Sequence, residues 1–298
     1  MGEASGRPYL IVGLGEVLWD LLPGGRQLGG APANFAYHAA RLGDRAVVAS
    51  RVGVDALGDE ALARLRQVGL PTEYVQREPV SPAEGGRPTG TAVPRLDAHG
   101  QATWTITAGV AWDALAWTPA WAALAAAADA VCFGSLAQRA PASRATIRRF
   151  LDATRPDALR LFDVNLRPPY YSAEVLAGSL ARARVVKLND QEAPVVAQLL
   201  GLAGADEVAW ARALLGAFPL TLVCVTRGGR GSLLVTAGEI SVHPGFPTAV
   251  VDTVGAGDAF TAALAHQLLR GASLAAAGEA ANRLGAWVAA RPGAMPAE

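Results

Sequence analysis

The chain has 298 residues, with 26 lysine and arginine residues balanced by 26 aspartate and glutamate residues, and 51% of its residues are hydrophobic. This composition is typical of a soluble globular protein with a large core and excludes a disordered chain. The zero net charge argues against a general nucleic-acid binder, and no uncharged apolar run reaches 18 residues. We therefore expect no nucleic-acid or membrane partner. The two distant cysteines fit buried free thiols and a cytoplasmic location.

Lys187 is the only lysine in the chain, and no glycine-rich loop precedes it. A Walker A loop needs its lysine beside glycines to reach the nucleotide phosphates, so a P-loop enzyme is excluded. The protein-kinase motifs are also absent. A Schiff-base enzyme would have to use Lys187, and nothing near it in the sequence favours that role.

Short apolar runs alternate with amphipathic or alanine- and leucine-rich stretches along the chain. Because the runs are apolar on both faces, we expect buried parallel strands at 9–12, 46–50, 130–133, 159–164, 184–188 and 221–225. Helices are expected at 34–42, 59–68, 142–153, 191–200, 207–216, 257–269 and 274–290. This alternation predicts an α/β fold with a mainly parallel sheet.

Other regions depart from this alternation. Residues 89–107 have the pattern of a β-hairpin with its turn at 97–100, and residues 16–28 lack helical character, so both could form a small accessory sheet. Residues 231–235 and 239–243 predict a second hairpin, and 248–251 predict a short strand.

The strongest candidate for chemistry is the segment 252–260, Asp-Thr-Val-Gly-Ala-Gly-Asp-Ala-Phe. Gly255 and Gly257 allow a tight turn whose N–H groups, with a helix dipole behind them, would bind an anion. Asp258 would then be either a favourable acid in the first helical turn or a base that accepts a hydroxyl proton during phosphoryl transfer.

A second candidate is the segment 29–34, Gly-Gly-Ala-Pro-Ala-Asn. Its glycines would let the backbone approach a ligand, and the Asn34 amide offers donors and an acceptor to sugar hydroxyls. The alternative is a loop that ends in an asparagine N-cap.

Three further segments follow expected strands. Asn189 and Glu192 would form either a capping box or a site near a magnesium–nucleotide. Arg167, in the segment 163–169, could hold a phosphate or carboxylate or cap a loop carbonyl. The glycine-rich segment 226–232 could cradle phosphates or join two strands. Since these segments all lie at strand ends, we expect one shared cleft.

These motifs, in this order over nearly the whole chain, resemble the ribokinase-like (PfkB) carbohydrate kinases, and the Gly-Gly-Ala-Pro-Ala-Asn segment resembles their fructokinase-like branch. The resemblance implies a three-layer sandwich with a mainly parallel central sheet and a small β-sheet lid. It implies a single kinase domain over 1–298, with lid segments at about 16–28 and 89–107.

The resemblance also implies residue roles. Asp258 would be the general base, and the anion hole for the transferred phosphate would consist of Gly255, Ala256 and Gly257. The sugar would be held by Asp20, Gly30 and Asn34, with Arg167 near the sugar or the phosphoryl path. Asn189 and Glu192 would organise Mg²⁺, largely through water. ATP would contact Thr226, Gly228, Gly231 and Asn282. A potassium ion would lie at Asp252, Val254, Val288 and Gly293, mostly on backbone carbonyls.

The lid of such kinases closes over the sugar and often forms a dimer interface, so this chain could be a homodimer. The lid positions that would contact the sugar or the partner are Val93, Leu96, Trp104 and Ile106. The favoured activity is ATP-dependent phosphorylation of D-fructose, with 2-keto-3-deoxygluconate or another sugar or nucleoside as the alternative. An acidic substrate would need an additional cation, for which Arg95 and Arg139 are candidates.

Two other classes of function remain open. A non-catalytic sugar or nucleotide sensor could use the same fold, although the base and the anion-hole residues are intact. A dinucleotide-dependent oxidoreductase is suggested by Gly13 and Gly15, but Leu18 stands at the third glycine position of that fingerprint.

Overall fold

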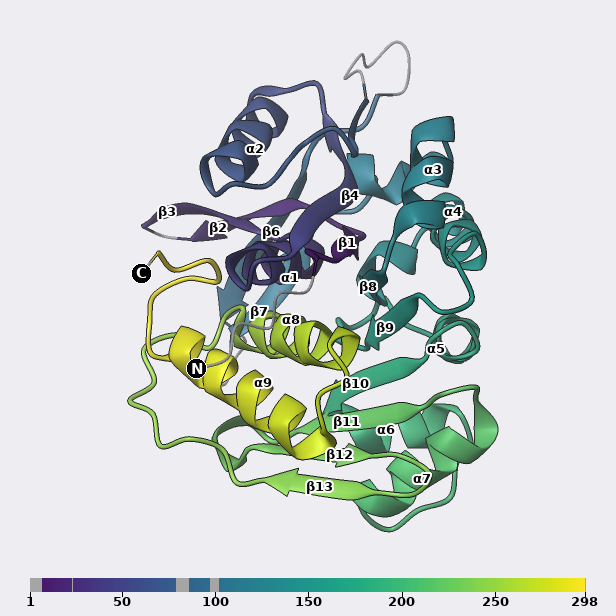
Figure 1. The fold of residues 1–298 in the computed structure, drawn as a ribbon. Coiled ribbons are helices and arrows are strands. Elements are labelled where there is room, and N and C mark those ends of the chain that lie inside the picture. The colour runs from purple at the N-terminus through teal and green to yellow at the C-terminus, as the bar shows by residue number, and fades with distance from the viewer. Residues whose placement is uncertain (1–6, 23, 79–85, 97–101, 298) are drawn as a thin grey trace.

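The computed structural model describes residues 7–22, 24–78, 86–96 and 102–297, and its larger sheet has nine strands. Their order is β13-β12-β11-β10-β9-β8-β1-β4-β5 (Figure 1). Seven of the strands run parallel: β1 (Leu10–Leu14), β4 (Arg45–Gly53), β5 (Val75–Glu78), β8 (Ala130–Gly134), β9 (Leu159–Asp163), β10 (Val185–Asn189) and β11 (Leu222–Thr226). An antiparallel hairpin of β12 (Ser232–Val235) and β13 (Ile240–His243) completes one edge.

Helices cover both faces of this sheet (Figure 1). One face carries α1 (Ala31–Arg41), α2 (Ala56–Gln67), α8 (Ala256–Leu269) and α9 (Leu274–Ala289). The other carries α3 (Pro119–Ala127), α4 (Pro141–Asp152), α5 (Ala173–Leu180), α6 (Glu192–Leu199) and α7 (Glu207–Ala217). The predicted α/β three-layer architecture is therefore confirmed.

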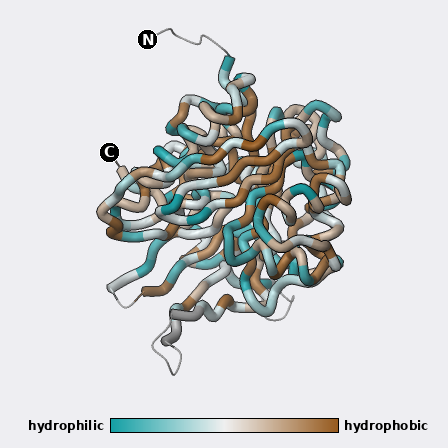
Figure 2. The backbone as a smooth tube through the Cα atoms, turned by 90° about the horizontal axis from the view of Figure 1, so that it is seen from below, coloured by the Kyte–Doolittle hydropathy of each residue, from teal (hydrophilic) through white to brown (hydrophobic). Residues whose placement is uncertain are grey.

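The apolar strands explain this arrangement. Successive side chains of a strand point to opposite faces, so Ile11 packs into one core cluster and Val12 into the other, and both are fully buried. Figure 2 shows the hydrophobic stretches gathered in the middle of the molecule. Two-sided burial of this kind is what a continuous apolar strand predicts.

The small sheet has the order β3-β2-β6-β7 and comes from the two irregular regions. Its strands are β2 (Leu18–Leu22), β3 (Gly25–Gly29), β6 (Gly90–Leu96) and β7 (Ala102–Ile106). The predicted 89–107 hairpin is confirmed through the antiparallel pairing of β6 and β7, while its turn at 97–100 lies outside the described residues. Residues 18–22 and 25–29 form the second hairpin of this sheet.

The structure differs from the expected elements in a few places. The predicted strand at 248–251 is wrong, because this segment runs over the surface with no strand beside it, and Val250 and Val251 are more than 60% exposed. Sequence analysis did not predict β5, α3 or α5. In the described ranges no helix is long and apolar enough to cross a membrane.

Candidate active site

A cavity of about 830 Å³ lies where β9, β10 and β11 end, and the small sheet forms part of its wall. This is the carboxyl edge of the parallel strands, where open α/β sheets bind ligands. Most predicted site residues line it: Asp20, Gly30, Asn34, Arg167, Asn189, Thr226, Gly228, Gly231, Val254, Gly255, Ala256, Gly257, Asp258 and Asn282. Glu192, Asp252, Val288 and Gly293 do not.

Asp258 lies in the first turn of α8, directly after the glycine-rich turn. Gly255 is the N-cap residue and has a left-handed backbone with φ of +78°. A Cβ at this position would also lie 2.6 Å from Ala294 Cα. The first N–H groups of a helix have no intrahelical acceptor. The Ala256 N–H donates to the Thr253 carbonyl at 3.3 Å, whereas the N–H groups of Gly257 and Asp258 have no acceptor among the described residues and can bind an anion.

The environment of Asp258 raises its pKa to about 7. Burial is the largest cause, and the negative charge of Asp163 adds to it. Three groups act in the opposite direction: Asn34, whose Nδ2 donates a 2.7 Å hydrogen bond to Asp258 Oδ2, and the cations of Lys187 and Arg167. A carboxyl with a pKa near 7 is suited to accept a proton at neutral pH.

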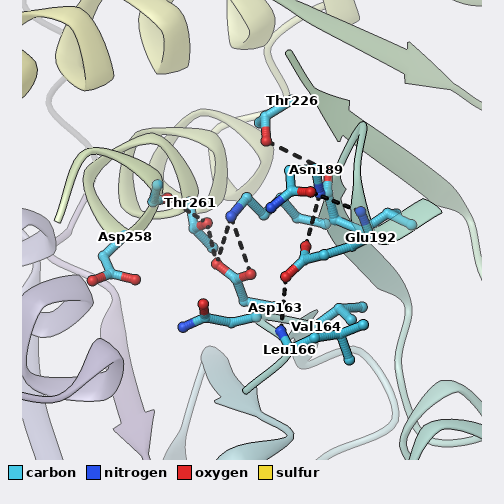
Figure 3. A network of polar contacts seen from close by, with 12 residues as sticks. Asp163, Val164, Leu166, Asn189, Glu192, Thr226, Asp258 and Thr261 are labelled. Carbon is cyan, nitrogen blue, oxygen red and sulfur yellow. Dashed lines mark hydrogen bonds and ion pairs between the residues drawn. The ribbon is translucent and has the colours of Figure 1, made fainter. Parts of the chain in front are cut away.

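A buried ion pair lies next to the first turn of α8 (Figure 3). Lys187 Nζ lies 3.1 Å from both carboxylate oxygens of Asp163, and Thr261 Oγ1 lies 3.0 Å from Asp163 Oδ2 and 2.9 Å from the Gly257 carbonyl. A Cβ at Gly257 would come within 3.1 Å of Lys187 Nζ. Sequence analysis gave Lys187 no role. Its position two residues before Asn189, near a strand end, could have indicated that it lies close to the site.

Asn189 and Glu192 form the capping box that was one of the two interpretations. Asn189 Oδ1 accepts the N–H of Glu192 at 2.8 Å, and Glu192 Oε2 accepts the N–H of Asn189 at 2.9 Å. The second oxygen of Glu192 accepts the N–H of Leu166 at 2.7 Å (Figure 3). The Glu192 carboxylate thus joins the start of α6 to the loop after β9, while Asn189 faces the cavity.

The end of the cavity beside the small sheet contains the carboxyl group of Asp20. Burial raises the pKa of Asp20 to about 6, although Arg167 lowers it. The Arg167 side chain is exposed and donates to its neighbour's carbonyl, that of Leu166. Gly30 has φ of +108°, and a Cβ there would lie 2.5 Å from the Glu16 carbonyl oxygen. Only glycine permits this close approach.

Arg139 is not available to bind a substrate. Its guanidinium donates to both carboxylate oxygens of Asp113, at 2.8 and 2.9 Å. It also lies over the rings of Trp112 and Tyr170 and does not line the cavity. The expectation that Arg139 could hold an acidic substrate is therefore wrong, because this buried pair already satisfies its charge. The side chain of Arg95 lies outside the described part of the chain.

The residues expected at ATP lie at the opposite end from the small sheet. Gly228 and Gly231 both have positive φ, and a Cβ at Gly231 would overlap the His243 carbonyl oxygen. Thr226 ends β11. Asn282 Nδ2 donates to Ser232 Oγ and to the Gly278 carbonyl, both at 2.7 Å, which holds its amide in place on the cavity wall.

Three of the four expected potassium residues, Asp252, Val254 and Gly293, come together beside α8. Asp252 Oδ1 accepts the N–H of Val254 at 3.0 Å, and Asp252 Oδ2 accepts the N–H of Gly293 at 2.9 Å. Val288 is buried in α9. The carboxylate thus joins the loop before α8 to the segment after α9.

The glycines behind the oxidoreductase alternative have a packing role. A Cβ at Gly13 would lie 2.1 Å from the Pro32 carbonyl oxygen, and one at Gly15 would lie 3.0 Å from the Pro32 ring. Both glycines let α1 pack closely against β1. This close packing gives no support to a dinucleotide site at this turn.

A buried carboxyl group of raised pKa beside the start of a helix, at the strand ends of this α/β fold, is an arrangement suited to phosphoryl transfer to a small molecule. The model of the pfkB family carbohydrate kinases matches residues 24–298. The chain belongs to this family, and it is a phosphotransferase that acts on a sugar hydroxyl.

Known relatives agree with this assignment. A fructokinase of Klebsiella pneumoniae is 35% identical over 84% of this chain and 81% of its own length, and a probable fructokinase of Arabidopsis thaliana is 30% identical over 100% and 96%. Among solved structures, a Vibrio cholerae fructokinase with fructose, ADP and calcium bound is 26% identical, with a TM-score of 0.80 over 96% of this chain and 94% of that chain. A Xylella fastidiosa fructokinase with bound ATP is 25% identical, with a TM-score of 0.79 over the same shares.

Proposed function

We propose that this chain is an ATP-dependent fructokinase. The observation that carries the proposal is the position of Asp258: it lies beside the free N–H groups of α8 and is hydrogen-bonded to Asn34 in the same cavity. Curated relatives named fructokinase at 29–35% identity favour D-fructose as the acceptor.

In the proposed reaction a fructose hydroxyl lies against Asp258. Asp258 takes the hydroxyl proton, and the hydroxyl oxygen forms a bond to the γ-phosphorus of ATP. The bond from that phosphorus to the β–γ bridging oxygen breaks, and ADP is released. The N–H groups of Gly255, Ala256 and Gly257 stabilise the negative charge on the transferred group. Asp20, Gly30 and Asn34 hold the sugar, and Arg167 lies between the sugar and the phosphates.

ATP occupies the end formed by Thr226, Gly228, Gly231 and Asn282, with adenine beside Asn282. Mg²⁺ would neutralise phosphate charge near Asn189, with Glu192 acting through the capping box and water rather than as a ligand, since both of its oxygens already accept backbone N–H groups. Potassium would lie among the carbonyls of Val254, Val288 and Gly293, with Asp252 as the charged partner.

The charge of the cavity favours a neutral acceptor over 2-keto-3-deoxygluconate. Four carboxyl residues, Glu16, Asp20, Asp190 and Asp258, line it together with Arg167, and Asp190 is paired with Arg230. Lys187 also lines it, but its ammonium is paired with Asp163. A sugar acid would bring a further negative charge to this end of the cavity.

We further propose that the small sheet is a lid over the sugar and the interface of a cytoplasmic homodimer. Trp104 and Ile106 line the cavity, whereas Val93 and Trp104 leave more than a third of their surface exposed. Sedimentation of the protein with and without fructose tests the dimer, and a single monomeric species in both would contradict it.

The experiment that tests the function is ADP release with Mg²⁺ and K⁺ over D-fructose, ribose, 2-keto-3-deoxygluconate and adenosine. We expect turnover that depends on fructose and disappears in Asp258→Asn. Turnover with another acceptor would agree with the proposed mechanism but contradict fructose as the substrate. Tight binding of fructose and ATP by calorimetry without ADP release would favour the sensor.

A further inference from the structure

Glu16 lies between β1 and β2 and lines the same cavity as Gly30, Asn34 and Asp258. The residue is only 4% exposed. It begins the expected lid segment 16–28 but was not a candidate for chemistry, and the proposed reaction assigns it no step.

Protein groups satisfy only part of this carboxyl. The backbone N–H groups of Glu16 and Ala31 donate hydrogen bonds to it, but Oε2 is buried and has no hydrogen-bond partner among the described residues. Burial raises the pKa of Glu16 to about 7, so the group is held near the point where it loses its proton. A buried carboxylate oxygen without a partner is costly, which indicates that a ligand supplies the missing donor.

The surroundings indicate what kind of ligand this is. Asn34 Oδ1 is also buried and has no hydrogen-bond partner in the part of the chain that the structure describes, while Asn34 Nδ2 is bonded to Asp258. Two acceptors thus lie beside the base and need donors. Hydroxyl groups supply such donors, and a negatively charged ligand would be repelled by Asp20, Asp258 and Glu16, so the complementary ligand is a neutral polyhydroxyl compound.

We infer that Glu16 binds a second hydroxyl of the acceptor sugar through Oε2 and thereby determines which hydroxyl faces Asp258. This inference rests on the proposed sugar-kinase function and adds a specificity residue to it. Glu16 is a positioning residue: it takes no proton from the reacting hydroxyl, but it holds the sugar in the orientation that brings that hydroxyl to the base.

The test uses two variants and one matched control. Glu16→Gln keeps an oxygen for the Ala31 N–H but removes the charge, and Glu16→Ala removes the side chain. The control is Glu78→Gln, because Glu78 is also a buried carboxylate, 8% exposed, but pairs with Arg51 and Arg87 and lies away from the cavity wall. Steady-state kinetics of ADP release give KM and kcat for each substrate.

We expect Glu16→Ala to raise the KM for D-fructose by roughly 10- to 100-fold and Glu16→Gln by roughly 3- to 10-fold, with the KM for ATP changed less than about twofold. Glu78→Gln leaves both KM values unchanged. If Glu16 only held Ala31 in place, the KM for D-fructose would be normal in Glu16→Gln, or the KM values for fructose and ATP would rise together in Glu16→Ala. Either result would overturn the inference.

Sugar analogues provide a second measurement. Wild type and Glu16→Ala are compared on fructose and on its monodeoxy analogues, each lacking one hydroxyl. The analogue that lacks the hydroxyl bound by Glu16 should have a low kcat/KM with the wild type. Its kcat/KM should not fall further in Glu16→Ala, because the hydrogen bond to Glu16 is already absent. Equal losses in both proteins for every analogue would refute the contact. If the wild type phosphorylates no sugar, the proposed function itself fails, which is a different outcome.

Discussion

Asn34 Nδ2 donates a 2.7 Å hydrogen bond to Asp258 Oδ2, and the two residues are 224 positions apart in the chain. This bond joins the start of α1 to the start of α8. It connects the predicted sugar-binding motif with the predicted base and favours the ionised form of that base.

Replacing Asn34 with alanine should raise the pKa of Asp258 further, since a donor to the carboxylate is lost. The ionised base is needed for turnover, so kcat/KM rises with pH through about 7 in the wild type and through a value about one unit higher in Asn34→Ala. Rates between pH 5.5 and 9 check this. An identical midpoint in the two proteins would mean that the observed ionisation is not that of Asp258.

Asp258→Asn should lower kcat by about 10²–10⁴-fold and, at the same time, stabilise the fold at alkaline pH. The sign follows from the raised pKa: the folded state holds the proton more tightly than the unfolded state, so ionising Asp258 costs stability as the pH rises from about 4 to about 7. The variant lacks this cost. Its Tm should exceed that of the wild type by a few degrees at pH 8 and by less at pH 5.

Scanning calorimetry at both pH values measures this difference. Asp157→Asn on the exposed surface serves as the control, because its side chain is 78% exposed. A lower Tm for Asp258→Asn at pH 8 would contradict the raised pKa.

Lys187→Met should destabilise the protein by about 3–5 kcal/mol, since it leaves the buried carboxylate of Asp163 without its cation. Adding Asp163→Asn removes that charge and should recover much of the loss. Urea unfolding of the single and double variants measures both steps. A double variant no more stable than Lys187→Met would show that the ion pair is not the source of the effect.

Gly255→Ala should reduce both stability and kcat, because φ of +78° disfavours alanine and the added Cβ would lie 2.6 Å from Ala294. Gly69→Ala is a matched control, with φ of +84° and no atom within 4 Å of the added Cβ. The control should lose about 1 kcal/mol and keep its kcat, while Gly255→Ala loses tenfold or more of its kcat as the free N–H groups shift. Equal kcat in the two variants would exclude this turn from the reaction.

Much of the arrangement could be predicted from local sequence. Apolar runs such as the one around Ile11 and Val12 predict two-sided burial, because a strand alternates its side chains between two faces. The turn around Gly255 and the position of Asp258 in the first turn of α8 follow from glycine geometry and helix periodicity. For the same local reason, the expected strand at 248–251 was wrong: β-propensity does not reveal whether a neighbouring strand exists.

The choice between alternatives needed tertiary contacts. The sequence allowed Glu192 to be a cap or a magnesium-site residue and Arg139 to be a substrate cation. Only the fold showed that Glu192 caps α6 and contacts Leu166, and that Arg139 is paired with Asp113. Lys187 and Glu16 reach the site because β10, α8 and the segment between β1 and β2 meet at one cavity. Burial, pairing and pKa depend on neighbours that are distant in the chain, so a sequence pattern can nominate Asp258 as a base, but only the fold surrounds it with Asn34, Asp163 and Lys187.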